Sequence, residues 1–425
     1  MPNKIILTLK NIFKNVNKEI LVDILLSAIV FFYGLIILRK NVGTPSISWM
    51  LVFNFSDFNN LHDLMGYIQN LRTGIPPLLS IFEIIVWLVT KNPQIPLVTI
   101  WLYRGSLIFS YILAIILFKK TIREKVFVFL LSIFFLTTTA LIHPGNPQIY
   151  DAIFPFLILL YFFLLEKSKN LYISKHSKLS LTLIVFASIT LCNIELLRPF
   201  AIIFLPIAIL AFIFFINDFV KNKTKILLAF LIPIILISVG WHVKLLVFND
   251  GQFLWSNHSG YNYSRLWADY TGVPELLEEE KPLQSDRWAN LNTETHYENS
   301  NTLSSFITQY ILDHPFQSIQ VINKQILTYL SAPVVTNNHV VSSRWLYFYP
   351  YVLLLCFVNL FYQVFFEITP RFLKIKNVLV HNENIIILFT FLIFIVSAIG
   401  EKGEEARFII SFLPLLAANF KSPKS

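Results

Sequence analysis

The chain has 425 residues, of which 55% are hydrophobic and only 14% are charged. A soluble domain of this size could not bury so much apolar surface, so the composition excludes an ordinary soluble protein and predicts a membrane protein. The net charge of +9 does not indicate nucleic-acid binding, because most Lys and Arg residues stand between apolar runs, where membrane topology explains them. Cys192 and Cys356 lie inside apolar runs and form neither a disulfide framework nor a metal-ligand spacing.

A membrane span needs about 20 apolar residues. We read the first apolar run as a retained span, because no small-residue cleavage site follows Leu38. The fold class predicted is an all-α polytopic membrane protein with about ten transmembrane helices and helices lying on the outer surface. The predicted spans are 20–38, 97–118, 126–142, 150–166, 179–196, 197–216, 226–247, 346–366, 383–399 and 408–420.

The apolar run 78–90 is too short to span, and we predict a helix on the outer surface there. With this assignment, the inner segments hold 20 of the 34 Lys and Arg residues. Cytoplasmic loops collect such residues, so both termini are expected in the cytoplasm. We expect a bacterial inner membrane with a periplasmic functional surface, and an endoplasmic-reticulum protein facing the lumen is the alternative.

The predicted topology divides the chain into a transmembrane region at 1–248, an external region at 249–345 and C-terminal spans at 346–425. A first outer loop, 39–96, belongs to the first region. Within the external region, apolar positions between Thr302 and Leu330 follow helical spacing, and His314-Pro315 interrupts them. An amphipathic helix with a break at this dipeptide is therefore predicted.

Charged side chains inside membrane spans are costly and commonly mark functional sites. Here they gather near the outer ends of the predicted spans, at Arg104, Asp151, Glu195 with Arg198, His242 with Lys244, and Glu404 and Glu405 with Arg407. The middle and inner parts of the spans are nearly free of charge, which argues against an ion path across the membrane. For Arg104 and Arg198 an interhelical salt bridge is an equally good explanation.

The first outer loop carries an acid on a short predicted helix. Asp63 and Tyr67 are four residues apart and share one helix face, and Gly74, Pro76 and Pro77 are expected to end the helix. This places a carboxylate near the bilayer surface. A simply solvated helix face explains Asp63 equally well on composition alone.

In these features the chain resembles the C-type glycosyltransferase superfamily, multispan enzymes that use polyprenyl-phosphate sugars, and is similar to lipid-linked aminoarabinose transferases and protein O-mannosyltransferases. The matching features are Asp63, Tyr67, Gly74, Pro76 and Pro77 in the first loop, Arg104 in the next span, the second acidic loop from His143 to Asp151, Arg198-Pro199, Ser259 to Asn262, and Glu405-Ala406-Arg407-Phe408 with Pro414. The chain lacks an Asp-Glu pair in the first loop, and Phe408 stands where Tyr is usual.

The resemblance implies sugar transfer from a polyprenyl-phosphate donor to a lipid, glycan or protein acceptor, with no nucleic-acid partner. Such a transfer passes through an oxocarbenium-like transition state and needs a general base for the acceptor hydroxyl and cations for the leaving phosphate. We assign the catalytic carboxylates to Asp63, Asp57 and Asp151. The donor phosphate is assigned to Arg104, Arg198, Arg407, His242 and Lys244, and the acceptor or sugar to Tyr67, His143, Asn146, Asn262 and Glu405.

A divalent metal is a further hypothesis. Asp151, His143 and Glu83 supply carboxylate and imidazole groups that suit such an ion, although they are far apart in the sequence. The short run 78–90 would line a groove for the lipid tail, or would anchor the loop at the interface through Trp87 and Phe82.

Three other functions remain open from the sequence. An envelope polysaccharide polymerase or ligase with a diphosphate-linked donor also places Arg and His residues in outer loops, but the acid in the first loop favours the monophosphate-type transferase. A lipid or solute transporter predicts inverted repeats and polar residues near the midplane, which the sequence does not display. The third is a membrane scaffold that presents 249–345 to a partner.

Overall fold

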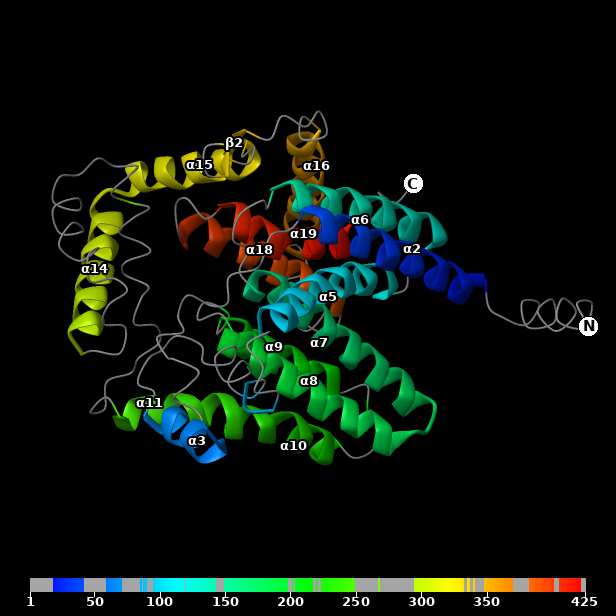
Figure 1. Ribbon diagram of the computed structural model, residues 1–425, viewed down its shortest axis with the longest axis horizontal. Helices are drawn as coiled ribbons and strands as arrows, with labels where there is room; N and C mark the ends of the chain where they lie inside the picture. Colours follow the sequence, from blue (N-terminus) through cyan, green and yellow to red (C-terminus); the bar gives the residue numbers. More distant parts are fainter. Residues whose placement is uncertain are drawn as a thin grey trace, which may run out of the picture.

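The computed structural model shows a bundle of apolar helices with an L-shaped pair of helices beside it (Figure 1). It describes residues 18–41, 59–70, 85, 87–89, 95–118, 120–142, 149–197, 201, 203–216, 219, 223–248, 267, 294–331, 335–336, 339–340, 348–369, 382–400 and 405–421. The helices of the first half are α2 (Lys18–Asn41), α3 (Leu61–Asn70), α5 (Ile95–Ile116), α6 (Ile122–Ile142), α7 (Ile149–Ile173), α8 (Ser177–Leu197) and α9 (Phe204–Phe215).

The second half continues with α10 (Lys223–Pro233), the π-helix η4 (Ile234–Val239) and α11 (Gly240–Phe248) as one continuous rod. Then follow α14 (Glu294–Asp313), α15 (Pro315–Ser331), the two-residue strands β1 (Val335–Thr336) and β2 (His339–Val340), α16 (Tyr349–Tyr362), the π-helix η6 (Gln363–Ile368), α18 (Asn382–Gly400) and α19 (Glu405–Asn419). The two strands pair antiparallel, with Val335 opposite Val340. The described part of the chain is otherwise helical, as predicted.

Each of the ten predicted spans contains a helix, but ten membrane crossings are not confirmed. Among the described residues, five helical stretches are long and apolar enough to cross a bilayer: Lys18–Arg39, Ile122–Leu141, Ser177–Leu197, Lys223–Val247 and Tyr349–Ile368. Shorter apolar stretches lie in α5, α9, α18 and α19. The protein is therefore an all-α integral membrane protein. For orientation we call the bundle end where α2 and α8 end, and where α5, α7 and α19 begin, the outer end, following the predicted topology.

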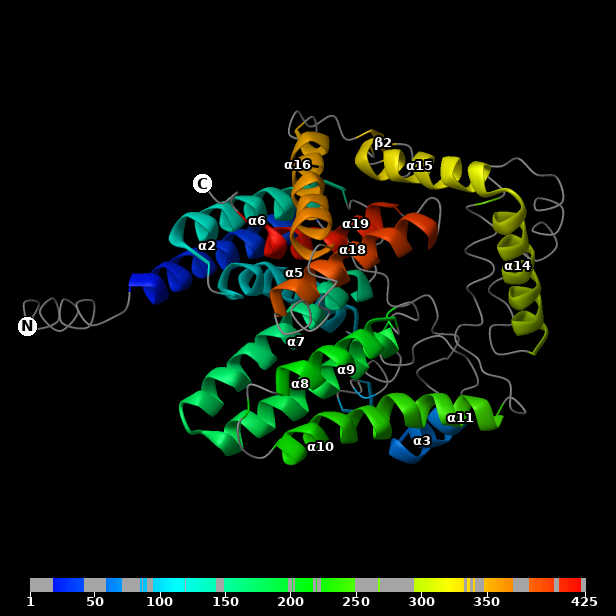
Figure 2. The same cartoon turned by 180° about the vertical axis from the view of Figure 1, so that it is seen from behind.

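The core of the bundle forms around α5, α7, α8 and α19. Helix α7 packs against α5 and α8, α2 packs against α5 and α6, and α19 packs against α5, α6, α7 and α18. Every residue of α19 from Ile410 to Asn419 is buried. Figure 2, from behind, shows α16 on the face of the bundle turned away from the viewer in Figure 1. Helix α19 is thus a central helix that other helices enclose.

Local sequence signals determine several helix ends. Thr121 and Glu124 form a capping box at the start of α6, since Glu124 Oε2 accepts from Thr121 N at 2.8 Å and Thr121 Oγ1 accepts from Glu124 N at 3.3 Å. Helix α7 ends in a Schellman turn in which Lys175 has a positive φ of 66° and His176 N donates to Leu171 O at 2.9 Å. This turn reverses the chain into α8, so that α7 and α8 are antiparallel neighbours.

The predicted amphipathic helix in the external region is confirmed, including its break. Helix α14 ends at Asp313 and α15 begins at Pro315. A proline is tolerated there because backbone N–H groups in the first turn of a helix have no acceptor within the helix, so its missing N–H breaks no bond. Trp267, Ile307 and Val321 form a small buried cluster at the inner side of this bend. The predicted surface helix at 78–90 lies mostly outside the described residues, and positions 85 and 87–89 are helical.

Candidate functional site

Asp63 lies in the first turn of α3, as predicted, and is half-buried. Its Oδ2 accepts a hydrogen bond from Asn59 N at 2.8 Å, while Asn60 Oδ1 accepts from His62 N at 2.8 Å and from Asp63 N at 3.1 Å. Asn60 is therefore the N-cap of α3, and the negative charge of Asp63 interacts favourably with the positive end of the helix dipole. The structure thus gives Asp63 a local role in ordering the start of α3.

Arg104 lies in α5, where its guanidinium carbon is 5.9 Å from the centre of the Trp101 ring. Arg39 lies near the outer end of α2, a helix that packs against α5. Two like charges repel at close range, so an anion held near both of them would be stabilised. Arg39 was not among the residues predicted for the site. The signal that identifies it is its position as the first residue of the predicted outer loop, directly after the first span.

Asp151 lies in the first turn of α7 and is fully buried. Its backbone oxygen accepts a hydrogen bond at 2.9 Å from the hydroxyl of Ser411 on α19. Position 407 lies one helical turn before Ser411, and therefore on the face of α19 that meets α7. The first turn of α7, where the second acidic loop ends, is therefore adjacent to the last span.

His242 on α11 pairs with Glu195 on α8, a residue that was not predicted for the site. The His242 Nε2 to Glu195 Oε1 distance is 2.6 Å, and Ser238 Oγ donates to the other carboxylate oxygen at 3.0 Å. The Glu195 side chain is only 3% exposed. Lys244, by contrast, lies 4.5 Å from the centre of the Trp241 ring. The imidazole of His242 is thus held by an acid from the neighbouring helix.

Other side chains of α8 donate to backbone oxygens of the α10–η4–α11 rod just before η4. Ser188 Oγ donates to Phe230 O at 2.5 Å, and Cys192 Sγ donates to Pro233 O at 3.7 Å. A proline and a π-segment leave carbonyl groups without their regular partners in the helix. Side chains at 188, 192 and 195, spaced along one face of α8, therefore form a polar seam along the α10–η4–α11 rod.

The remaining predicted site residues lie outside the described residues or have side chains that are not described. The first group is Asp57, Glu83, His143, Asn146, Arg198 and Asn262, and the second is Tyr67, Glu405 and Arg407. Of the three residues assigned to a divalent metal, only Asp151 is described. No group of three or more His, Cys, Asp or Glu residues that could hold a metal ion occurs in the described ranges. The metal stays a prediction.

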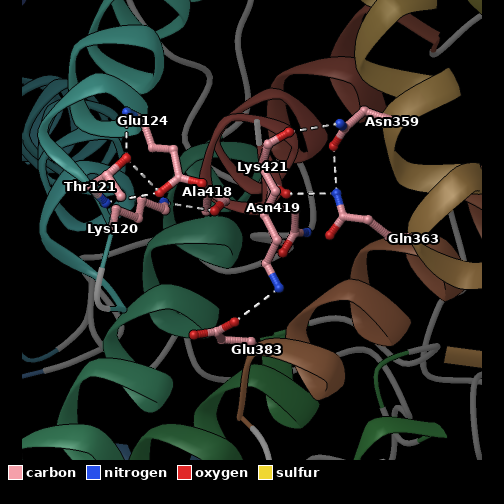
Figure 3. Close-up of polar contacts among 9 residues, drawn as sticks. All are labelled: Lys120, Thr121, Glu124, Asn359, Gln363, Glu383, Ala418, Asn419 and Lys421. Carbon is pink, nitrogen blue, oxygen red and sulfur yellow. Dashed lines mark hydrogen bonds and ion pairs between the residues drawn. The ribbon is translucent and has the colours of Figure 1, made fainter. Parts of the chain in front are cut away.

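A second polar cluster lies at the inner end of the bundle and was not predicted from the sequence (Figure 3). Lys120, between α5 and α6, donates to Ala114 O at 2.7 Å and to Ala418 O at 2.8 Å. Burial lowers the pKa of Lys120 to about 7, while Glu383, Glu124 and Glu166 oppose this shift and Lys421 adds to it. The sequence identified Lys120 only as one residue of a basic loop.

The described residues therefore form two outer groupings, together with the Glu195–His242 pair and the inner cluster. One grouping is Arg39 and Arg104 on the adjacent helices α2 and α5, and the other is Asp151 with α19. The described hydrogen bonds of Asp63 stay within its own helix start and do not join it to these groups. A comparison of the chain with known protein families, with curated proteins and with solved structures finds no match.

Proposed function

We propose that the protein is a glycosyltransferase that moves a sugar from a polyprenyl-phosphate donor to a lipid, glycan or protein acceptor at the non-cytoplasmic face of the membrane. The observation that carries this proposal is that Arg39, near the outer end of α2, and Arg104, in α5, lie on two helices that pack against each other. A phosphate between two guanidinium groups relieves their repulsion and gains charge-assisted hydrogen bonds. A lipid phosphate in the outer leaflet has the charge and the depth that such a pair would serve.

In the proposed reaction, the acceptor oxygen forms a bond to the anomeric carbon while the bond from that carbon to the phosphate oxygen breaks. Asp63 accepts the proton of the acceptor hydroxyl. The polyprenyl phosphate departs with an added negative charge, which Arg39 and Arg104 stabilise. Asp151, buried beside α19, orients the acceptor or a divalent metal, and Arg407 adds a further positive charge at the same end of the bundle. The membrane proposed is a bacterial inner membrane, with this site in the periplasm.

The proposal is tested with purified protein in liposomes that contain a radiolabelled polyprenyl-phosphate sugar and candidate acceptors. Wild type is expected to release polyprenyl phosphate and transfer the label. Arg104→Gln and Arg39→Gln each remove one cation from the leaving group, and we expect turnover to fall by roughly a hundredfold or more. Arg123→Gln is the matched control, because Arg123 is exposed at the inner end and lies away from the site.

The outcomes separate the proposal from its rivals. If wild type neither binds nor consumes monophosphate donors, the transferase function is wrong, and turnover of a diphosphate-linked donor in the same assay would support a polymerase or ligase. If both arginine variants keep full activity while wild type transfers sugar, the function stands and the phosphate assignment is wrong. A protein inactive in every assay is the result expected of a scaffold.

A second candidate, a lipid or solute transporter, is favoured by one observation. Glu195 and His242 form an acid–imidazole pair within apolar helices, next to a π-helical segment. Ionisable pairs at membrane depth and local π-helices both occur frequently at transport and proton-transfer sites. Uptake of a labelled lipid or solute into liposomes, lost in Glu195→Gln, would support this function in place of transfer.

A further inference from the structure

The inner end of α19 is held by side chains from several other elements (Figure 3). The backbone oxygen of Ala418 accepts from Lys120 Nζ at 2.8 Å, and that of Asn419 accepts from Gln363 Nε2 at 2.9 Å. Beyond the helix end, Lys421 O accepts from Asn359 Nδ2 at 3.0 Å. The three donors come from the α5–α6 turn, from η6 and from α16.

Two further contacts complete this arrangement, which we call the inner clamp (Lys120, Asn359, Gln363, Glu383 and Thr390). Asn419 Nδ2 donates to Thr390 Oγ1 at 2.5 Å, and Lys421 Nζ lies 2.9 Å from Glu383 Oε2. Both Thr390 and Glu383 belong to α18. The Gln363 side-chain amide also donates to Asn359 Oδ1, which links two members of the clamp to each other.

The last four carbonyl groups of a helix have no partner within the helix. In α19, two of these carbonyl groups, those of Ala418 and Asn419, accept hydrogen bonds from side chains in distant parts of the chain. A shift of α19 by one residue moves its backbone about 1.5 Å along the axis, which is enough to break hydrogen bonds of this length. The clamp therefore fixes the axial position of α19, and not only its rotation.

The outer part of the same helix makes the contact with Asp151. Ser411 Oγ donates to Asp151 O at 2.9 Å, and Ser411 is 2% exposed. Seven residues separate Ser411 from Ala418, a distance of about 10 Å along a helix. Pro414 lies between them. It removes one backbone hydrogen bond but leaves the helix continuous, so a displacement at Ala418 reaches Ser411.

We infer that Lys120 and Gln363 are positioning residues that act through α19, fixing the contact between Ser411 and Asp151 in the outer part of that helix. The role of that outer contact in sugar transfer rests on the proposed function. The mechanical link itself does not, because it follows from hydrogen bonds at both ends of one buried helix.

The test uses the thiol chemistry of the whole protein. Ser411→Cys places a nearly isosteric thiol at the outer contact, and the two native thiols, Cys192 and Cys356, are buried and free. The rate of N-ethylmaleimide labelling at each thiol is measured by mass spectrometry for Ser411→Cys in four backgrounds. These are native, Lys120→Met, Gln363→Leu and the control Arg123→Met, which changes an exposed basic residue near Lys120.

Loss of one buried hydrogen bond shifts an opening equilibrium by about tenfold, so labelling of the introduced thiol is expected to accelerate by about that factor in Lys120→Met and Gln363→Leu. Cys192 and Cys356 are expected to keep their native rates, and Arg123→Met is expected to change nothing. Leucine has a volume close to that of glutamine and is suited to a buried position. Gln363→Leu is therefore the variant that tests the inference if Lys120→Met does not fold.

Two results would overturn the inference. In one, the introduced thiol keeps the labelling rate of the native background in both clamp variants. In the other, all three thiols become reactive together, which shows general loosening and no specific link. Labelling needs no substrate, so it is independent of the transferase assay. If the proposed function also holds, Gln363→Leu is expected to lower kcat with little change in the KM for the donor, because the clamp does not touch the donor.

Discussion

Glu195 on α8 and His242 on α11 are 47 residues apart in the chain, and their side chains meet at 2.6 Å within the apolar bundle. Ser238 supplies the second hydrogen bond to the same carboxylate. The rod of α10, η4 and α11 packs mainly against α8. This pair therefore joins the rod to the rest of the protein near its outer end.

Replacing one member of the Glu195–His242 pair should lower the stability of the protein more than replacing both. Glu195→Ala leaves His242 and Ser238 without their shared acceptor, and a broken buried pair costs about 3 kcal/mol or more. The double variant Glu195→Leu with His242→Leu leaves no buried imidazole without a partner and should be closer to wild type. Thermal unfolding in detergent measures both, and an equal loss in the two variants would contradict the pairing.

Gly34 should tolerate no side chain. A Cβ atom at this position would lie 2.6 Å from Cγ1 of Ile108, which is fully buried in α5. Small residues allow membrane helices to approach closely, and overpacking costs about 1–3 kcal/mol. Gly34→Ala should lower the melting temperature, and adding Ile108→Ala should restore part of it. Gly66→Ala is the control, since a Cβ there meets nothing within 4 Å.

Stability should rise with pH above neutrality because of Lys120. Burial lowers its pKa to about 7 in the folded protein, whereas the unfolded chain restores the higher value of an ordinary lysine. Between these two values the unfolded state binds more protons, so the free energy of unfolding increases as pH rises. The destabilising effect of the charge is complete below about pH 7 and diminishes from there upward.

The measurement is the unfolding free energy of wild type and Lys120→Met from about pH 6 to about pH 9.5, a window that spans most of the interval between the two pKa values. The difference between the two proteins should change over this range, because only wild type contains the titrating amine. Arg123→Met should follow wild type throughout. A pH-independent difference between wild type and Lys120→Met would contradict a lowered pKa for Lys120.

Variants of Asp63 and Asn60 should distinguish a catalytic role of Asp63 from a role in capping α3. Asn60→Ala removes the N-cap of α3 and should cost about 1 kcal/mol of local helix stability. Asp63→Asn keeps an oxygen that can accept from Asn59 N but cannot act as a base at neutral pH. If the proposed function holds, Asp63→Asn abolishes transfer while hydrogen exchange in α3 stays near native. Full transfer activity in Asp63→Asn would make its role purely structural.

Most helices were predictable from the sequence because apolar length is a local property. A run of about 20 apolar residues needs a helix in a bilayer, since only a helix satisfies its own backbone groups there. The break at His314-Pro315 was predicted for the same kind of reason. The number of crossings was less predictable. Within the span predicted at 197–216, for example, the described helix α9 covers only Phe204–Phe215.

The candidate site was less predictable than the helices. Asp151 and Arg104 were identified because charges in apolar runs are rare, and this signal needs no tertiary information. Glu195 was identified as a charge near the outer end of a span but was not assigned to the site, and Arg39 was not identified. The importance of each depends on a partner that belongs to another helix. The inner clamp had no sequence signal, since Asn359 and Gln363 resemble ordinary polar residues near the end of a span.

The sequence by itself therefore determined that this is a helical membrane protein, and where its helices and intramembrane charges lie. Only the tertiary structure decided which groups meet, such as the side chains of Glu195 and His242, or Lys120 Nζ and the backbone oxygen of Ala418, 298 residues away. The physical reason is that hydropathy fixes the length of a helix, whereas its rotation and axial position are fixed by packing and hydrogen bonds from neighbouring helices.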